Sequence, residues 1–320
     1  MTDFRLQAAA DWAESLLGQA CEVVPLAGDA SFRRYFRVHT ADCRYVLMDA
    51  PPDKERLEPF LFVRAWMAQS DVRVPKLLGE DKGQGFLLLE DFGDMTWSLA
   101  LQRQQPIAPM LEDAWRQLLL IQASHEIASL PRFDVDRMRL ECDLFLDWYL
   151  PYVADCQPSE DERGHFHEGL LPLLTRIDAM PKVAVHLDYH SRNLMLPSDS
   201  FPLGVIDFQD AVYGPVTYDA ASLLYDCYQD YPESLRQEWS LNLWERLPQE
   251  MRAGFQHEEH WHESLRLTAL QRHIKAMGIF ARLAYRDGKQ QFLNEIPLTR
   301  KHLLEEIAAL DLDLPELLLR

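Results

Sequence analysis

The chain has 320 residues, of which 48% are hydrophobic, and its 32 basic and 51 acidic residues give a formal net charge of −19. This length suffices for two lobes with separate cores, and the acidic surface argues against nucleic acid or membrane partners, whose phosphates need clustered cations. Five scattered cysteines without a CxxC pair, an N-terminus interrupted by acids and no long apolar run predict a cytoplasmic protein with reduced thiols and no evident protein partner.

The first third of the chain has the pattern of a small antiparallel sheet with flanking helices. Apolar residues at helical spacing predict a helix over 5–19, and β-rich runs predict strands at 32–38 and 44–49. A second helix is expected within 54–70, with Pro59 in its first turn or splitting it. Residues 74–91 predict two more strands, joined by a hairpin at Gly83 and Gly85.

From about residue 96 the pattern becomes mainly helical. Amphipathic stretches predict helices at 108–129, 137–153, 160–179, 217–227, 233–246, 259–286 and 299–310. One β-like island, 183–210, interrupts them. We therefore expect an α+β fold with a small sheet-rich N-lobe over 1–93 and a larger helical C-lobe over 94–320.

The β-like island contains the pattern His186-x-Asp188-x₄-Asn193, followed by Asp207. Phosphoryl transfer needs a carboxylate that orients or deprotonates an alcohol, and metal ions that neutralise the charge on the phosphates. We assign Asp188 as the base and Asn193 and Asp207 as oxygen ligands for Mg²⁺. The alternative is that Asp188 and Asn193 only cap a turn, but turn chemistry does not require a second carboxylate after a hairpin. For His186 we favour a buried residue that braces the loop over a direct role in the reaction.

The segment His186–Asn193 (HLDYHSRN), with Ile206-Asp207-Phe208 after it, resembles the aminoglycoside phosphotransferase and choline kinase superfamily. The resemblance implies a bilobal protein-kinase-like fold and ATP as the phosphoryl donor. Residues 214–224 (GPVTYDAASLL) match the family's Tyr-Asp segment, in which Asp219 would hydrogen-bond to the catalytic loop and hold it rigid.

Residues 87–93 (LLLEDFG) include a triplet, Asp91-Phe92-Gly93, that is spelled like the magnesium-binding triplet of protein kinases. The resemblance instead makes this segment the interlobe hinge, where backbone groups near Glu90 and Phe92 would meet the adenine edge. Asp207 takes the metal-binding role, and Asp91 is expected to be a solvated turn carboxylate.

Three further blocks, 28–38 (GDASFRRYFRV), 48–55 (MDAPPDKE) and 272–289 (RHIKAMGIFARLAYRDGK), resemble a bacterial branch of this superfamily. Its characterised members are anomeric kinases of N-acetylmuramate and N-acetylglucosamine that act in peptidoglycan recycling. The resemblance implies ATP as donor and the sugar C1 hydroxyl as acceptor, giving the α-1-phosphate. Alternatives are a kinase of another small alcohol, such as an aminoglycoside or choline, and a non-catalytic ATP-binding sensor. A protein kinase is disfavoured because no Ala-Pro-Glu anchor follows Asp207.

Other candidate binding residues are less specific. The small-residue turn Gly28, Asp29, Ala30 and Ser31 could place backbone N–H groups over phosphates. Trp148 and Tyr149 could stack on a sugar ring, although their helical spacing is also typical of core residues.

Arg272, His273 and Lys275 form a group of cations that would suit the lactyl carboxylate of a muramate, or else a solvated helix face.

Typical kinases carry a lysine on the third strand that pairs with the donor phosphates, and the matching position here is Met48, which cannot donate to phosphate. We expect Arg33 or Arg34 to supply the missing charge, with Lys54 or Mg²⁺ alone as alternatives. The acid that would pair with this lysine is then not needed, and Glu58, the nearest candidate, is expected to be a helix-surface acid.

Overall fold

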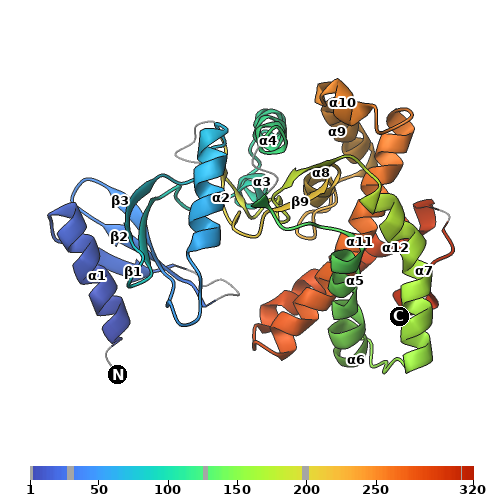
Figure 1. The fold of residues 1–320 in the computed structure, drawn as a ribbon, viewed down its shortest axis with the longest axis horizontal. Helices are drawn as coiled ribbons and strands as arrows, with labels where there is room; N and C mark the ends of the chain where they lie inside the picture. The colour runs from blue at the N-terminus through green and yellow to red at the C-terminus, as the bar shows by residue number, and fades with distance from the viewer. Residues whose placement is uncertain (1–2, 27–31, 125–128, 197–201, 311) are drawn as a thin grey trace. The chain divides into compact units, whose positions relative to one another are not determined.

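The computed structural model describes residues 3–26, 32–124, 129–196, 202–310 and 312–320 (Figure 1). The chain divides into two compact units: unit 1 comprises Met1–Met95 and Met195–Asp210, and unit 2 comprises Thr96–Leu194 and Ala211–Arg320. Unit 1 contains a five-stranded sheet and unit 2 is mainly helical, so the predicted α+β class is confirmed. Among the described residues, no helix combines the length and the apolar character needed to cross a bilayer.

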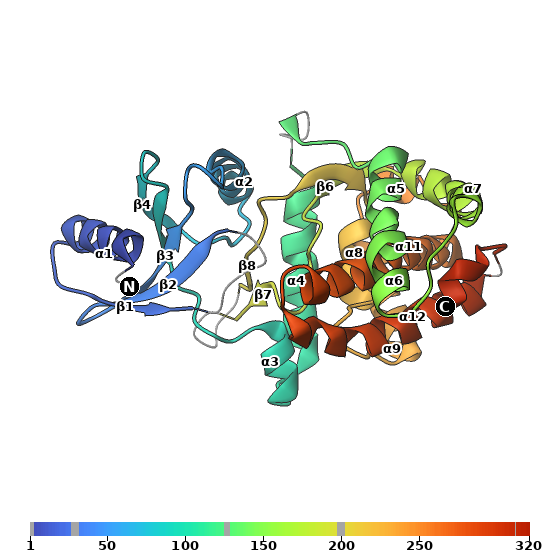
Figure 2. The same ribbon diagram turned by 90° about the horizontal axis from the view of Figure 1, so that it is seen from below.

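Unit 1 is built on an antiparallel sheet with the strand order β1-β2-β3-β5-β4. Its elements before the short strand β8 (Gly204–Val205) are α1 (Phe4–Leu17), β1 (Glu22–Pro25), β2 (Arg34–His39), β3 (Arg44–Asp49), α2 (Glu58–Gln69), β4 (Leu77–Asp81) and β5 (Phe86–Glu90). Figures 1 and 2 show α1 and α2 on opposite faces of this sheet.

The core between α1 and the sheet is formed by residues one helical turn apart on α1 and by alternate residues of the strands. Ala9 and Ala13, one turn apart on α1, pack on a cluster of side chains from alternate strand positions, Phe36, Val38, Leu47, Phe86 and Leu88. Asp3 caps the start of α1 by accepting a hydrogen bond from the Leu6 N–H at 3.0 Å. The sheet face opposite α1 therefore carries the side chains of the intervening strand residues.

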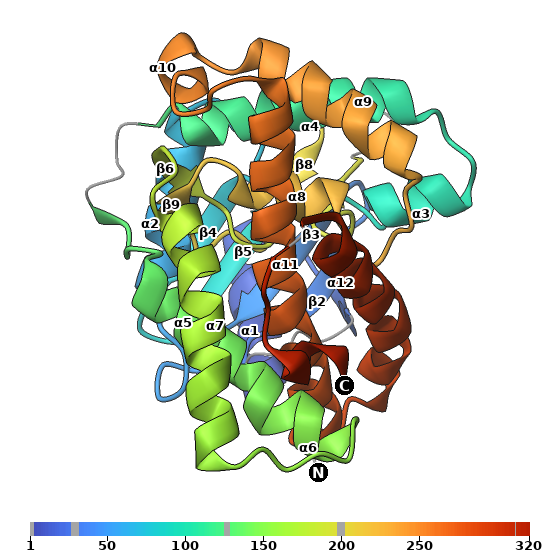
Figure 3. The same ribbon diagram turned by 90° about the vertical axis from the view of Figure 1, so that its right-hand side faces the viewer.

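Unit 2 surrounds one long central helix, α11 (Glu258–Tyr285), which lies between α5 and α7 on one side and α12 on the other (Figure 3). Its other helices are α3 (Trp97–Gln102), α4 (Ile107–Gln122), α5 (Val135–Leu144), α6 (Leu150–Tyr152), α7 (Glu160–Asp178), α8 (Tyr218–Leu224), α9 (Glu233–Arg246), α10 (Gln249–Arg252) and α12 (Ile296–Leu310). Its irregular helices are the π-helix Phe145–Tyr149 and the 3₁₀ turns Gln290–Glu295 and Glu316–Leu319.

Short strands form in and next to the β-like island. β6 (Lys182–Val185) pairs antiparallel with β9 (Val212–Pro215), and β7 (Leu194–Met195) pairs with β8. The island thus supplies strands to two two-stranded ladders, with β9 following just after it, and the predicted catalytic segment leaves the end of β6.

Most of the predicted elements are confirmed, including the helices expected at 5–19, 160–179 and 259–286. Pro59 lies at the second position of α2, where no backbone N–H is needed, and the helix begins only at Glu58. The expected helix 137–153 is interrupted by the π-helix, and β1, α3 and α10 were not predicted. Residues 125–128, the end of the helix expected at 108–129, lie outside the described residues.

The π-helix lies where α11 passes very close to the backbone of Leu144 and Phe145. A Cβ atom added at Gly278 of α11 would stand 2.3 Å from the backbone carbon of Leu144 and 2.5 Å from the Phe145 nitrogen. Only glycine fits at this crossing, because both neighbouring atoms are backbone and cannot rotate away.

We predict that Gly278→Ala lowers the free energy of unfolding by about 1–3 kcal/mol, because overpacking outweighs the helix propensity of alanine. Gly164→Ala is the matched control, since Gly164 is exposed on α7 with nothing within 4 Å of the added Cβ. The free energy of unfolding of this control should rise by about 0.5–1 kcal/mol. Urea denaturation of both variants is the measurement, and equal gains in stability would contradict the close crossing.

Candidate active site

The predicted catalytic segment is a tight turn that two buried carboxylates hold by its backbone. Asp219, in the first turn of α8, accepts hydrogen bonds from the N–H groups of His186 at 2.7 Å and Leu187 at 3.1 Å. Asp226, just after α8, accepts one from the Ser191 N–H at 2.9 Å. Leu187 has φ 77°, a left-handed conformation that side chains rarely adopt. The turn is therefore held from both ends in a conformation that it would not adopt alone.

Asp219 makes the contact with the catalytic loop that the resemblance implies. Burial raises the pKa of Asp219 to about 7, while the hydrogen bonds from His186 and Leu187 act in the opposite direction. His186 is fully buried, and its Nδ1 accepts a hydrogen bond from the Asp188 N–H at 3.2 Å. This is a bracing contact of the kind expected for His186.

Asp188 lies at the centre of the turn, half-buried and next to Asn193, whose Nδ2 donates to the Asp188 carbonyl oxygen at 3.0 Å. Burial alone would raise the pKa of the Asp188 carboxyl, but the charge of Lys275, with smaller contributions from neighbours that include Arg272, lowers the pKa below its ordinary value. Asp188 is consequently ionised at neutral pH, as a proton acceptor must be.

The cations near Asp188 come from one face of α11. Lys275 forms an ion pair with Glu141 of α5 at 3.2 Å and donates to the Tyr218 hydroxyl at 3.4 Å. Arg272 lies over the Tyr218 ring at 5.4 Å and is only 7% exposed. Its Nε and Nη1 are buried and donate to no group in the part of the chain that the structure describes. Arg272 thus presents hydrogen-bond donors that the described residues do not use.

His273 does not belong to this cation group, contrary to the sequence-based expectation. It is fully buried, its Nε2 lies 3.0 Å from the Tyr225 carbonyl oxygen, and burial lowers its pKa well below the ordinary value. Successive residues on a helix point in directions about 100° apart, so His273 faces away from its neighbour. The alternative of a solvated helix face is wrong as well, because Arg272 is also buried.

Asp207 belongs to unit 1, where it follows β8 in a left-handed conformation with φ 64°. Its Oδ1 accepts a hydrogen bond from Gln209 Nε2 at 2.7 Å, and the adjacent Phe208 packs on Phe60 of α2 with ring centroids 5.0 Å apart. Aspartate is among the residues that tolerate this backbone region best. The packed Phe208 thus anchors the strand end that carries the carboxylate.

The chemistry of Asn193 and Asp207 fits magnesium, since both offer hard oxygen atoms. No group of three or more His, Cys, Asp or Glu residues that could hold a metal occurs in the described ranges. Magnesium commonly takes only one or two protein ligands together with substrate phosphates. Asn193 belongs to unit 2 and Asp207 to unit 1, and their assignment as magnesium ligands stays a prediction.

Asp91 is not the solvated turn carboxylate that the sequence predicts. Its side chain is 2% exposed and accepts hydrogen bonds from Arg37 Nε at 2.7 Å and from the Gly93 N–H at 2.8 Å. A buried carboxylate needs such a partner, because desolvation without one costs several kcal/mol. Asp91 thus ties the segment after β5 to strand β2.

Two other predicted nucleotide-binding residues, Glu90 and Phe92, both contact Arg73. Glu90 pairs with Arg73 through both carboxylate oxygens, at 2.5 and 2.8 Å, and this hydrogen bonding lowers the pKa of Glu90. Arg73 also lies 4.6 Å from the ring centroid of Phe92, which is buried against Gly204. Gly28, Asp29, Ala30 and Ser31 lie outside the described residues.

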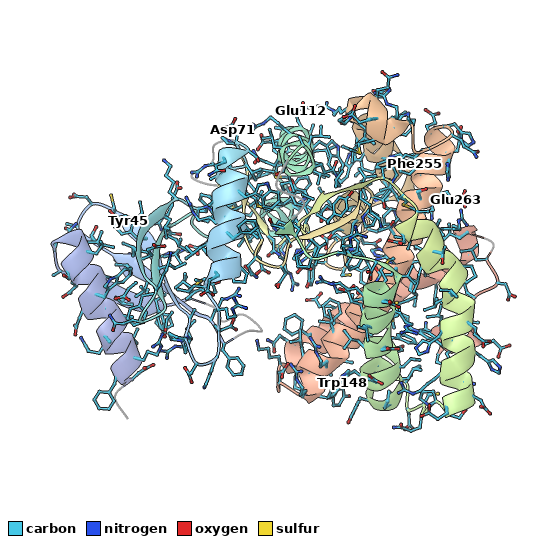
Figure 4. The ribbon with its side chains drawn as sticks, viewed as in Figure 1. Tyr45, Asp71, Glu112, Trp148, Phe255 and Glu263 are labelled. Atoms are coloured by element: carbon cyan, nitrogen blue, oxygen red, sulfur yellow. The ribbon has the colours of Figure 1, made fainter. Side chains whose placement is uncertain are left out.

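The two aromatic candidates for a sugar contact differ in position. Tyr149 is a core residue, stacked on Phe145 at 4.8 Å with its hydroxyl donating to the Arg320 carbonyl oxygen, so the expectation of a sugar contact is wrong for it. Trp148, which Figure 4 labels, is half-buried. Its ring stacks on that of the exposed Tyr152 of α6, with the two centroids 5.4 Å apart. Trp148 therefore remains the only one of the pair that a ligand could reach.

Asp226, Glu141 and Tyr218 were not assigned from the sequence. A signal for Asp226 exists, because Tyr218-Asp219 is repeated seven residues later as Tyr225-Asp226. The repeat marks a second carboxylate of the same kind, although Asp226 itself lies beyond the end of α8. No local pattern identifies Glu141, whose partner Lys275 is more than a hundred residues away in the chain.

Comparison with known proteins identifies the class. The model of the phosphotransferase enzyme family matches residues 22–254, and the chain belongs to this family. It is 35% identical over 306 residues to the N-acetylmuramate/N-acetylglucosamine kinase of Pseudomonas putida, covering 92% of this chain and 89% of that protein. It is 37% identical over 292 residues to the protein of the same name from Pseudomonas aeruginosa, and the match covers 90% of this chain and 84% of that protein.

Solved structures support the fold. Choline kinase LicA from Streptococcus pneumoniae has a TM-score of 0.66 at 12% identity, covering 95% of this chain and 100% of that one. The ADP-bound aminoglycoside phosphotransferase APH(2'')-Ib has a TM-score of 0.61 at 12% identity, covering 93% and 98%. The predicted protein-kinase-like fold and the enzyme class, a phosphotransferase, are thus confirmed.

We predict that Asp219→Asn lowers the free energy of unfolding by about 1–3 kcal/mol. An amide of the same shape offers one oxygen and one NH₂ group, so one of the two backbone N–H groups loses its acceptor. Urea denaturation is the measurement, and Glu238→Gln, an exposed acid on α9, is the control and should change stability by less than about 0.5 kcal/mol. Equal effects of the two substitutions would show that Asp219 does not hold the turn.

Proposed function

We propose that this phosphotransferase is a kinase that transfers the γ-phosphoryl group of ATP to the anomeric hydroxyl of N-acetylmuramate and N-acetylglucosamine. The observation that carries the proposal is an ionised Asp188 on a braced turn with unused cationic donors beside it, in a chain 35–37% identical to kinases named for these sugars. The product would be the α-1-phosphate, which suits recycling of cell-wall sugars.

In the proposed mechanism Asp188 orients the C1 hydroxyl and accepts its proton as the oxygen attacks the γ-phosphorus. The P–O bond to ADP breaks while the new C1–O–P bond forms, and ADP leaves with the electron pair. His186, Asp219 and Asp226 keep the carboxylate in place without touching substrate. Lys275 helps to keep Asp188 in its carboxylate form until the proton arrives.

On the nucleotide side, the proposal assigns residues 1–93 to a nucleotide-binding lobe and 94–320 to a lobe for catalysis and the acceptor. Backbone groups near Glu90 and Phe92 would contact adenine, and the turn Gly28–Ser31 would contact phosphate. Asn193 and Asp207 would hold Mg²⁺, which neutralises phosphate charge when bound. A relative of the fold, LicA, has been crystallised with AMP, which supports a nucleotide donor.

On the acceptor side, Arg272 is the proposed partner of the lactyl carboxylate that distinguishes N-acetylmuramate from N-acetylglucosamine. Its buried donors lie near Asp188, and the other cation of the group, Lys275, is already paired with Glu141. An arginine is well suited to this role because its planar guanidinium matches a carboxylate. Trp148, which is half-buried, would be the candidate for stacking on the sugar ring.

The direct test is turnover of Mg-ATP with N-acetylmuramate, N-acetylglucosamine, glucose, kanamycin and choline, followed as ADP release. We expect turnover with the two N-acetyl sugars and a loss of about 10²–10⁴ in kcat in Asp188→Asn, the usual contribution of a general base, while ATP binding persists. Turnover restricted to kanamycin or choline would reject the sugar assignment. ATP binding without turnover of any acceptor would indicate a sensor.

We also predict that Arg272→Gln lowers kcat/KM for N-acetylmuramate at least about tenfold more than for N-acetylglucosamine. A hydrogen bond to a charged group contributes about 1.5–3 kcal/mol, and each 1.4 kcal/mol is a factor of ten. Arg286→Gln, just after α11 with a half-exposed side chain, is the control for net charge and should affect both sugars alike. Equal losses with both sugars in Arg272→Gln would remove the carboxylate contact from the proposal.

A further inference from the structure

The third strand lacks the lysine that binds donor phosphates in typical kinases, and the structure indicates which residue replaces it. Met48 of β3 is fully buried and offers no donor. Sequence alone leaves Arg33 and Arg34 as equivalent neighbours. The pairing of β2 with β3 separates them, because adjacent residues of a strand point to opposite faces of the sheet.

Arg34 is committed to the face covered by α1. It lies opposite Asp49 in the β2–β3 ladder and donates to the Asp49 carboxylate from Nε at 2.9 Å. Asp49 is fully buried and also accepts from Arg5 of α1 at 2.6 Å, while Arg34 reaches Asp3 as well. Arg34 therefore neutralises a buried carboxylate on the α1 side and is not placed with Met48.

Arg33 immediately precedes β2 and is two residues before Tyr35, which lies opposite Met48 in the ladder. Residues two apart point to the same face of a sheet, so Arg33 points to the face of Met48. Its Nη2 lies 3.5 Å from Glu55 Oε2, and the other oxygen of Glu55 accepts the Phe32 N–H at 3.0 Å. The Arg33 and Glu55 side chains are only 9% and 15% exposed. Glu55 thus holds both the backbone before β2 and the guanidinium.

Glu58, by contrast, is 71% exposed and pairs with Arg56 at 3.5 Å, so it is the helix-surface acid that the sequence predicts. Lys54 lies 5.3 Å from the ring centroid of Phe32. Of Arg33, Arg34 and Lys54, only Arg33 both points to the same face of the sheet as Met48 and pairs with a mostly buried carboxylate.

We propose that Arg33 binds the phosphates of the nucleotide donor and that Glu55 positions it. A guanidinium has five N–H donors, so it can keep Glu55 on one edge and bind phosphate oxygens with another. In typical kinases a lysine on the third strand binds the donor phosphates and is positioned by a glutamate on the following helix. Here Arg33, just before β2, would take the place of that lysine, and Glu55, before α2, would take the place of the glutamate. This inference rests on the proposed function, since it assumes a nucleoside triphosphate as donor.

The test is the affinity of the full-length protein for Mg-ATP and for adenosine, measured by calorimetry. Arg33→Gln should weaken ATP binding at least about tenfold and leave adenosine binding unchanged, because adenosine carries no phosphate. Arg56→Gln is the control, since it removes one positive charge from the same segment at a side chain that is 81% exposed. Thermal unfolding of each variant reports whether it is folded, and Arg33→Met, which keeps an apolar stem but removes the charge, replaces Arg33→Gln if the latter is not.

A double-mutant cycle tests the positioning role of Glu55. Glu55→Gln should weaken ATP binding by a smaller factor, and that effect should disappear in the Arg33→Gln background. Additive losses would show that Glu55 does not act through Arg33. Wild-type ATP affinity in a folded Arg33 variant would overturn the inference and leave the proposed function intact, whereas an enzyme that binds ATP but phosphorylates no amino sugar would contradict the proposed function alone.

Discussion

The geometry at Asp188 depends on the two hydrogen bonds that the buried Asp219 carboxylate accepts from the backbone of the turn at His186 and Leu187. Leu187 adopts a left-handed conformation there, which costs about 1–3 kcal/mol for a residue with a side chain. An ordinary hydrogen bond contributes about 0.5–1.5 kcal/mol and one to an ionised acceptor contributes more, so the pair offsets a strain of this size. The position of Asp188 is thus fixed by hydrogen bonds within the protein, which form without any ligand.

Electrostatics near this turn differ from those of the protein as a whole. The chain carries a net charge of −19, yet charges farther than about 10 Å are screened, so the nearest groups dominate. Near Asp188 these groups include Lys275 and Arg272, and Glu141 neutralises Lys275 without neutralising Arg272. The electrostatics at this turn are therefore set by a few cations and carboxylates that pack together, and not by the net charge of the chain.

The parts that could be predicted from the sequence are those whose signal is local. Periodicity placed the long helices, and the spacing of Asp188 and Asn193 brought both into one turn, joined by the Asn193 side chain at 3.0 Å. The roles of Asp91 and Glu55 were out of reach, because each depends on an arginine from another part of the chain. A carboxylate in a turn looks the same in sequence whether water or a guanidinium covers it. The orientation of His273 required the exact helical register of α11 against its neighbours.

The position of Arg272 and Lys275 depends in turn on how α11 packs. Gly278 lies three residues after Lys275 and six after Arg272, which is about 4.5 and 9 Å along a helix that rises 1.5 Å per residue. The close backbone crossing at Gly278 therefore sets the height of the helix within two turns of both cations. A side chain at that position would have to lift α11 away from Leu144, and the same movement would shift the donors of Arg272 relative to Asp188. The π-helix that begins at Phe145 lies at this contact, as π-turns often lie near functional sites. Packing at Gly278 thus fixes the position of both cations relative to Asp188.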